Sequence, residues 1–103
     1  MDIKKILEEA TLTGASDLFI IAGRPLTYKT KGVMHTLDNN RLEPKDTYVF
    51  VSGIYELAQR DITEFEQTGD DDFSFAIPGI SRFRVSTFKQ RCSYSAVIRV
   101  ISF

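Results

Sequence analysis

The sequence is poor in the residues that usually mark a catalytic or disulfide-bonded protein. Its 103 residues include one cysteine, one histidine and no tryptophan. A lone Cys92 cannot form an internal disulfide, and a lone His35 without a second ligand candidate gives no metal site. The sequence also lacks a GxxxxGK[ST] phosphate loop, a Ser/His/Asp arrangement, paired carboxylates and a CxxC motif. It therefore offers no nucleophile and no phosphate cradle of its own.

Strong net charge and long apolar runs are absent too. The net charge is −1, which argues against a nucleic-acid partner. No run approaches the roughly 18 apolar residues of a membrane span, so we expect no membrane insertion. Charges interrupt the apolar residues of MDIKKILEEA, which is therefore not a signal peptide. We expect a cytoplasmic protein, with Cys92 as a small buried hydrophobe and His35 on the surface or packed.

The chain has the length of one domain, residues 1–103, and 43% of it is hydrophobic, which suffices for one core. Apolar spacing predicts helices over residues 2–13, 44–59 and 60–67 and strands over 16–22, 26–31 and 33–37, followed by a polar loop over 38–42. Three further strands are predicted over 71–77, 81–90 and 93–102. Asp2 is expected to cap the first helix, and Pro44 to lie in the first turn of the second. The order predicts an α+β, PAS-like domain with a mostly antiparallel sheet of about six strands and helices packed on one side.

Periodicity across these elements predicts a single core. Its expected members are Ile3, Ile6, Leu7, Leu18, Ile20, Val51, Ile54, Phe73, Phe75, Phe83, Val85 and Ile98.

Arginines on the last two predicted strands are the most informative residues. Residues 81–89 alternate, so that Arg82 and Arg84 share the face opposite Phe83. Arg99 lies between valine and isoleucine residues and is expected to be half-buried, which would require a partner. That partner is either one of the carboxylates at 70–72 or a backbone carbonyl, or it is a phosphate, which a guanidinium binds bidentately. If the two strands pair as a hairpin, Arg84 lies opposite Arg99.

Asp17 stands at the start of the first predicted strand. Taken alone, it is expected to be a junction residue that holds backbone amides.

Several segments resemble the PilT-like and GspE-like ATPases, which power type IV pili (twitching motility) and type II secretion. Residues 14–18, GASDL, resemble the GASD[LI]H strand entry of that family. Residues 72–79, DFSFAIPG, and 82–86, RFRVS, look like the DFSF…PG…RFRVN block of the retraction ATPases. Residues 89–91 and 96–101 resemble the elements that follow.

The resemblance implies the N-terminal domain of a homohexameric pilus retraction ATPase. A PAS-like domain would be joined to a RecA-like ATPase domain that is absent here and that holds ATP and Mg, so this part alone would be no enzyme and bind no cofactor. Its partners would be its own C-terminal ATPase domain, neighbouring subunits and an inner-membrane pilus platform protein. By motif, Arg84 and Arg99 would contact nucleotide phosphates, with Arg82, Arg91 and Asp17 in possible support.

Three positions depart from the family pattern, namely Phe19 for His, Lys31 for an acidic residue and Ser86 for Asn. Ser86 is common in GspE-like members, so a pilus-assembly or type II secretion ATPase is an alternative, although the DFSF…PG block favours retraction. Two further hypotheses are a freestanding PAS-like ligand sensor and a plain oligomerisation module. A Walker A loop encoded after residue 103 would separate the motor from these two.

Overall fold

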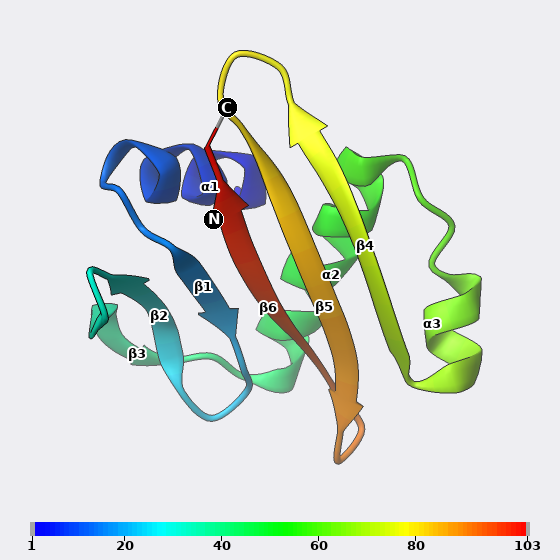
Figure 1. Cartoon of the computed structure of the whole chain (residues 1–103). Helices are drawn as coiled ribbons and strands as arrows, with labels where there is room; N and C mark the ends of the chain where they lie inside the picture. Colours follow the sequence, from blue (N-terminus) through cyan, green and yellow to red (C-terminus); the bar gives the residue numbers. More distant parts are fainter. Residues whose placement is uncertain (1, 103) are drawn as a thin grey trace.

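The computed structural model describes residues 2–102, which form one six-stranded sheet and three helices (Figure 1). The elements follow in the order α1 (Ile3–Leu12), β1 (Asp17–Ile20), β2 (Pro25–Thr30), β3 (Val33–Arg41), α2 (Pro44–Ala58), α3 (Thr63–Thr68), β4 (Asp70–Ile77), β5 (Ser81–Gln90) and β6 (Ser93–Ile101).

The sheet has the strand order β3-β2-β1-β6-β5-β4, and every neighbouring pair is antiparallel. The first and last strands therefore lie side by side in its centre. In Figure 1, α1 and α2 lie behind the sheet and α3 lies beside its edge strand β4, so no helix crosses the face that is turned to the viewer. This confirms the predicted α+β architecture with helices on one side.

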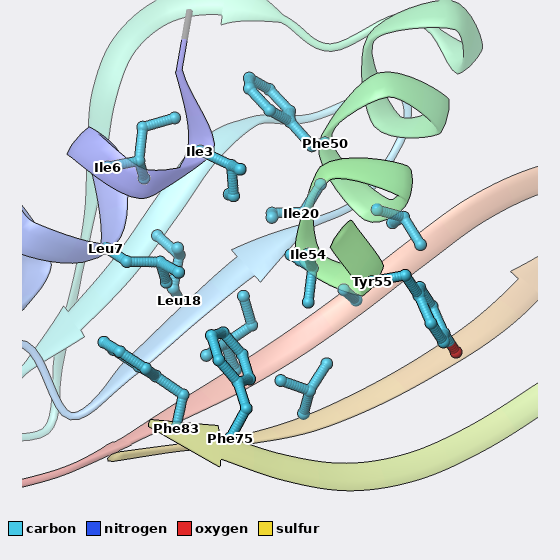
Figure 2. Close-up of a cluster of buried hydrophobic side chains, with 14 of the residues drawn as sticks. Ile3, Ile6, Leu7, Leu18, Ile20, Phe50, Ile54, Tyr55, Phe75 and Phe83 are labelled. Carbon is cyan, nitrogen blue, oxygen red and sulfur yellow. The ribbon is translucent and has the colours of Figure 1, made fainter. Parts of the chain in front are cut away.

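The core lies between the helices and the covered face of the sheet (Figure 2). Helix α1 contributes a stripe of buried residues at 3, 6, 7 and 10, and Asp2 caps it by accepting a 2.9 Å hydrogen bond from the Lys4 amide. Of the predicted core residues, all are buried except Phe73, which is partly buried and packs against the others. The prediction of a single core is confirmed.

A glycine inside α2 allows the two long helices to approach closely. A Cβ atom at Gly53 would lie 2.9 Å from Cγ2 of Ile3, closer than side chains pack. The usual cost of glycine within a helix is about 1 kcal/mol, and here it permits close contact between α1 and α2.

Three local predictions are wrong. Residues 38–41 continue β3 instead of forming a loop, and α3 begins at Thr63 instead of Arg60. Cys92 is exposed, and it lies with Arg91 in the β5–β6 turn, where both residues have positive φ angles of 67° and 51°.

Two absences hold for the part of the chain that the structure describes. No helix within residues 2–102 is long and apolar enough to cross a membrane. The same residues contain no group of three or more histidine, cysteine or acidic side chains able to hold a metal ion. His35 is exposed and stacks on Tyr28 with 5.2 Å between ring centroids.

Candidate anion-binding face

The sheet face that no helix covers, called the open face below, carries the arginines singled out from the sequence. In β5, Phe83 and Val85 are fully buried towards the helices, whereas Arg82 and Arg84 are exposed. The alternation of side chains along a strand therefore places the arginines on the open face. Arg99 reaches the same face from β6, because it pairs directly with Arg84.

One row of paired residues crosses the open face through five strands. Asp17 of β1 lies opposite Arg99 on one side and Lys29 of β2 on the other, and Arg84 lies opposite both Arg99 and Ser74. The predicted juxtaposition of Arg84 and Arg99 is confirmed. Two like charges in directly opposed positions destabilise a sheet unless an anion lies nearby.

Among the described residues, the carboxylate that forms an ion pair with either arginine belongs to Asp17. Its Oδ1 lies 3.6 Å from Nε of Arg99, and its Oδ2 accepts a 2.8 Å hydrogen bond from the Ser16 hydroxyl. The Asp17 side chain is only 16% exposed, so it is held firmly in place. The expected role of Asp17 differs from the observed one, because its carboxylate accepts from a hydroxyl and neutralises an arginine instead of holding backbone amides.

Arg99 is more exposed than predicted. Its side chain is 69% exposed. Side chains alternate along β6, so the apolar neighbours of Arg99 face the helices and Arg99 faces away from them. An exposed ion pair contributes about 0–1 kcal/mol to stability. Arg99 is therefore not a buried charge that the fold must neutralise, and its guanidinium is accessible from outside.

The acidic run in β4 makes other contacts. Asp71 accepts two 2.9 Å hydrogen bonds from the Arg60 guanidinium and one of 2.8 Å from the Tyr55 hydroxyl. Asp72 accepts a short hydrogen bond from Ser86. The carboxylates at 70–72 thus make no ion pair with Arg84 or Arg99. Asp71 binds Arg60 and Tyr55, and Asp72 binds Ser86.

Arg84 has no side-chain counter-ion in the part of the chain that the structure describes. Within residues 2–102, neither Arg82 nor Arg84 makes an ion pair with a side chain. Arg82 lies two positions from Arg84 on the same face. The three guanidinium groups form an exposed cationic patch that can accept an oxyanion through bidentate hydrogen bonds. Two carboxylates share its face, namely Asp17, which pairs with Arg99, and Asp72, which lies diagonal to Arg84 and accepts from Ser86.

Arg91 is not brought to this patch. It lies in the β5–β6 turn, seven residues beyond Arg84, which corresponds to about 20 Å along an extended strand. The structure therefore separates it from Arg84 and Arg99.

A six-stranded antiparallel sheet with helices packed on one face is the α+β fold of the N-terminal domain of PilT-type ATPases. The chain is homologous to the N-terminal region of the type IV pilus ATPases PilT and PilU of Pseudomonas aeruginosa. It is 37% identical to PilT over 101 residues, covering 98% of this chain and 29% of PilT. For PilU the identity is 36% over 101 residues, covering 98% of this chain and 26% of the relative.

Solved structures agree with this relationship. The pilus retraction motor PilT with bound ADP superposes with a TM-score of 0.78 at 36% identity, over 96% of this chain and 29% of that one. The Legionella pneumophila ATPase DotB shares the fold, with a TM-score of 0.74 at 22% identity, over 98% of this chain and 29% of its own. No family model matches the chain. The chain thus spans less than a third of the length of these relatives.

Proposed function

We propose that this chain is the N-terminal domain of a PilT-like pilus retraction ATPase and that it supplies arginines to a nucleotide held by another domain. The observation that carries the proposal is the opposed pair Arg84 and Arg99 on the open face, where Arg84 has no counter-ion among the described residues. The homology to PilT, a protein solved with ADP, supports a phosphate as the missing anion.

The proposed mechanism is electrostatic. In the whole protein, the open face would pack towards a RecA-like ATPase domain that binds ATP and Mg. Arg84 and Arg99 would then stabilise the charge that develops on the phosphoryl oxygens during hydrolysis and would sense its loss afterwards. Asp17 would position Arg99 by its ion pair, and Arg82 would add positive charge on the same face.

The same proposal assigns the domain its partners and place. It would contribute subunit contacts in a homohexamer at the cytoplasmic side of the inner membrane, where the motor meets the pilus platform protein. The domain would move relative to its ATPase neighbour as the nucleotide state changes.

A second candidate is the same domain in an assembly or secretion ATPase. The likeness of the fold to DotB and the serine at position 86 favour this alternative. The arginines would have the same role in either motor.

The first test asks whether the chain binds ATP by itself. Calorimetric titration of ATP into the 103-residue chain in moderate salt is expected to show no micromolar affinity. Arginines without backbone amides around the phosphates give only weak attraction that salt screens.

The gene sequence after residue 103 is expected to encode a Walker A loop. Micromolar binding by this chain, or a gene that ends here, would contradict the proposal.

A further inference from the structure

A depression on the open face has no role in the proposed function. It has a volume of about 480 Å³ and lies where β1 ends beside the β5–β6 turn. The residues that matter in its lining are Ile21, Arg24, Phe88, Gln90, Arg91 and Ser95. No acidic residue among those described lines it. Its lining therefore combines two arginine side chains, neutral hydrogen-bond donors and the aromatic ring of Phe88.

Ser95 supplies the observation that points to a ligand. Its side chain is 1% exposed, and its hydroxyl has no hydrogen-bond partner among the described residues. A buried polar group without a partner costs about 1–3 kcal/mol in proteins, so such groups are rare and usually have an explanation. Ser95 lies opposite Phe88 in the β5–β6 ladder and belongs to the lining of the depression. A ligand oxygen that reached this hydroxyl from the depression would supply its missing hydrogen bond.

Both arginines are held at the rim by their backbone. The turn before β2 is tied to the end of β3, since Gly23 donates to the Leu42 carbonyl at 2.8 Å and the Leu42 amide donates to the Arg24 carbonyl at 2.9 Å. Arg91 occupies a two-residue hairpin turn in the left-handed region with a φ of 51°. Within residues 2–102, neither arginine makes an ion pair.

We infer that this depression binds the phosphate group of a small phosphate monoester, with the organic part of the ligand against Phe88. Two guanidinium groups match the double negative charge of a monoester near neutral pH. The Ser95 hydroxyl and the Gln90 amide add donors for its remaining oxygens. Phe88 and Ile21 are half-buried and give an apolar surface, which inorganic phosphate would leave unused.

The site is separate from the one in the proposed function. Phe88 lies four residues from Arg84 on β5, which corresponds to about 13 Å. A variant that removes Arg84 therefore leaves this depression intact, and each proposal can fail without the other.

The test is an NMR titration of the ¹⁵N-labelled chain at constant ionic strength with phenyl phosphate, inorganic phosphate and benzoate. We expect saturable shifts of the Arg24, Arg91 and Ser95 amides with phenyl phosphate, in the millimolar range. Inorganic phosphate should bind more weakly, because it does not contact Phe88. Benzoate should bind more weakly still, because a carboxylate carries one charge and two oxygens.

Variants identify the groups responsible. Arg24→Ala and Arg91→Gly should each weaken phenyl phosphate binding about tenfold, as expected for the loss of a charge-assisted hydrogen bond. Glycine at position 91 keeps the positive φ of the turn. Lys5→Ala, an equal change of charge on the exposed side of α1, should leave the affinity unchanged.

Ser95→Ala provides an independent readout. Without ligand, it should leave the melting temperature unchanged or raise it, since an unpaired buried hydroxyl is removed. It should also reduce the rise in melting temperature that phenyl phosphate causes in the parent chain. Equal binding of benzoate, equal weakening by Lys5→Ala, or shifts that do not saturate would each overturn the inference.

Discussion

At the scale of single residues, Asp71 joins three parts of the fold. Its carboxylate binds the Arg60 guanidinium and the Tyr55 hydroxyl, and that hydroxyl also lies 2.8 Å from the Thr87 hydroxyl. Burial raises the pKa of Tyr55, so it remains a protonated donor. The hydrogen bonds from Arg60 are the main cause that lowers the pKa of Asp71 below the ordinary value of 3.8.

This network predicts a dependence of stability on pH. Because the folded pKa of Asp71 lies below its unfolded value, its contribution is present above about pH 4 and is lost as pH falls through the folded pKa. Asp71→Asn should lower the free energy of unfolding at about pH 6 by on the order of 2 kcal/mol. In this variant, the free energy of unfolding from denaturant melts should also fall less steeply as the pH drops below about 4. Asp70→Asn is the matched control and should change neither; an unchanged acid profile in Asp71→Asn would contradict this account.

Arg99 shows what a residue's neighbours in sequence can and cannot predict. Alternation in 81–90 and 93–102 correctly places Arg84 opposite Arg99. The expected half-burial of Arg99 is wrong, because strand periodicity separates two faces without telling which one the helices cover. The Asp17–Arg99 ion pair is not predictable from local pattern either, since it joins strands far apart in sequence whose pairing depends on the whole sheet. Hydrogen bonding of the carboxylates at 71 and 72 depends likewise on tertiary structure.

At the scale of elements, β5 has its two faces in opposite surroundings. Phe83 is fully buried among the helices, while Phe19 of β1 is only half-buried. Phe83→Ala should therefore cost about 3–5 kcal/mol in denaturant melts. Phe19→Ala is the control and should cost distinctly less. A loss below about 1 kcal/mol for Phe83→Ala would mean that the faces of β5 are reversed.

The β5–β6 turn contains two residues in a conformation that is unfavourable for them. Cys92 has a φ of 67°, and for a residue with a side chain the left-handed region costs about 1–2 kcal/mol. Cys92→Gly should therefore raise the free energy of unfolding by about 0.5–1 kcal/mol, after the greater entropy of unfolded glycine is subtracted.

The converse change serves as its control. Gly32 has a φ of 79° and open space around it, so Gly32→Ala should destabilise the chain through backbone strain alone. If Cys92→Gly lowered stability, the turn would not have this conformation.

The extension of β3 to Arg41 explains one failure of pattern-based prediction. Residues 33–41 are all exposed, because β3 is an edge strand with little covering it. Polar residues at 38–40 therefore show no alternation, and they lie where the register between β2 and β3 shifts, between the pairs Thr27–Thr36 and Pro25–Arg41. By contrast, α1, α2 and the strands of the C-terminal half bury one face each, and their predicted positions agree with the structure within a few residues.

At the scale of the whole molecule, the domain buries a single hydrophobic core but leaves one face of its sheet uncovered by helices. Its buried residues form one cluster, yet one face of the sheet remains open (Figure 1). Strand alternation and pairing place Arg82, Arg84 and Arg99 on that face. Sequence patterns predict the sheet, the helices on one side and the homology. They do not show that Arg84 makes no ion pair with any residue in the described range 2–102, because that depends on where every nearby carboxylate lies.

The central claim concerns Arg84 and Arg99, and ATP turnover by the whole protein tests it most directly. Arg84→Ala and Arg99→Ala should each lower turnover about tenfold or more, as arginines that contact a transferred phosphoryl group do, while thermal melts stay close to the parent. Arg41→Ala, an exposed arginine at the end of edge strand β3, is the matched control and should keep full turnover. If both variants keep parental turnover but melt earlier, the two arginines only support the fold and the proposed function is wrong.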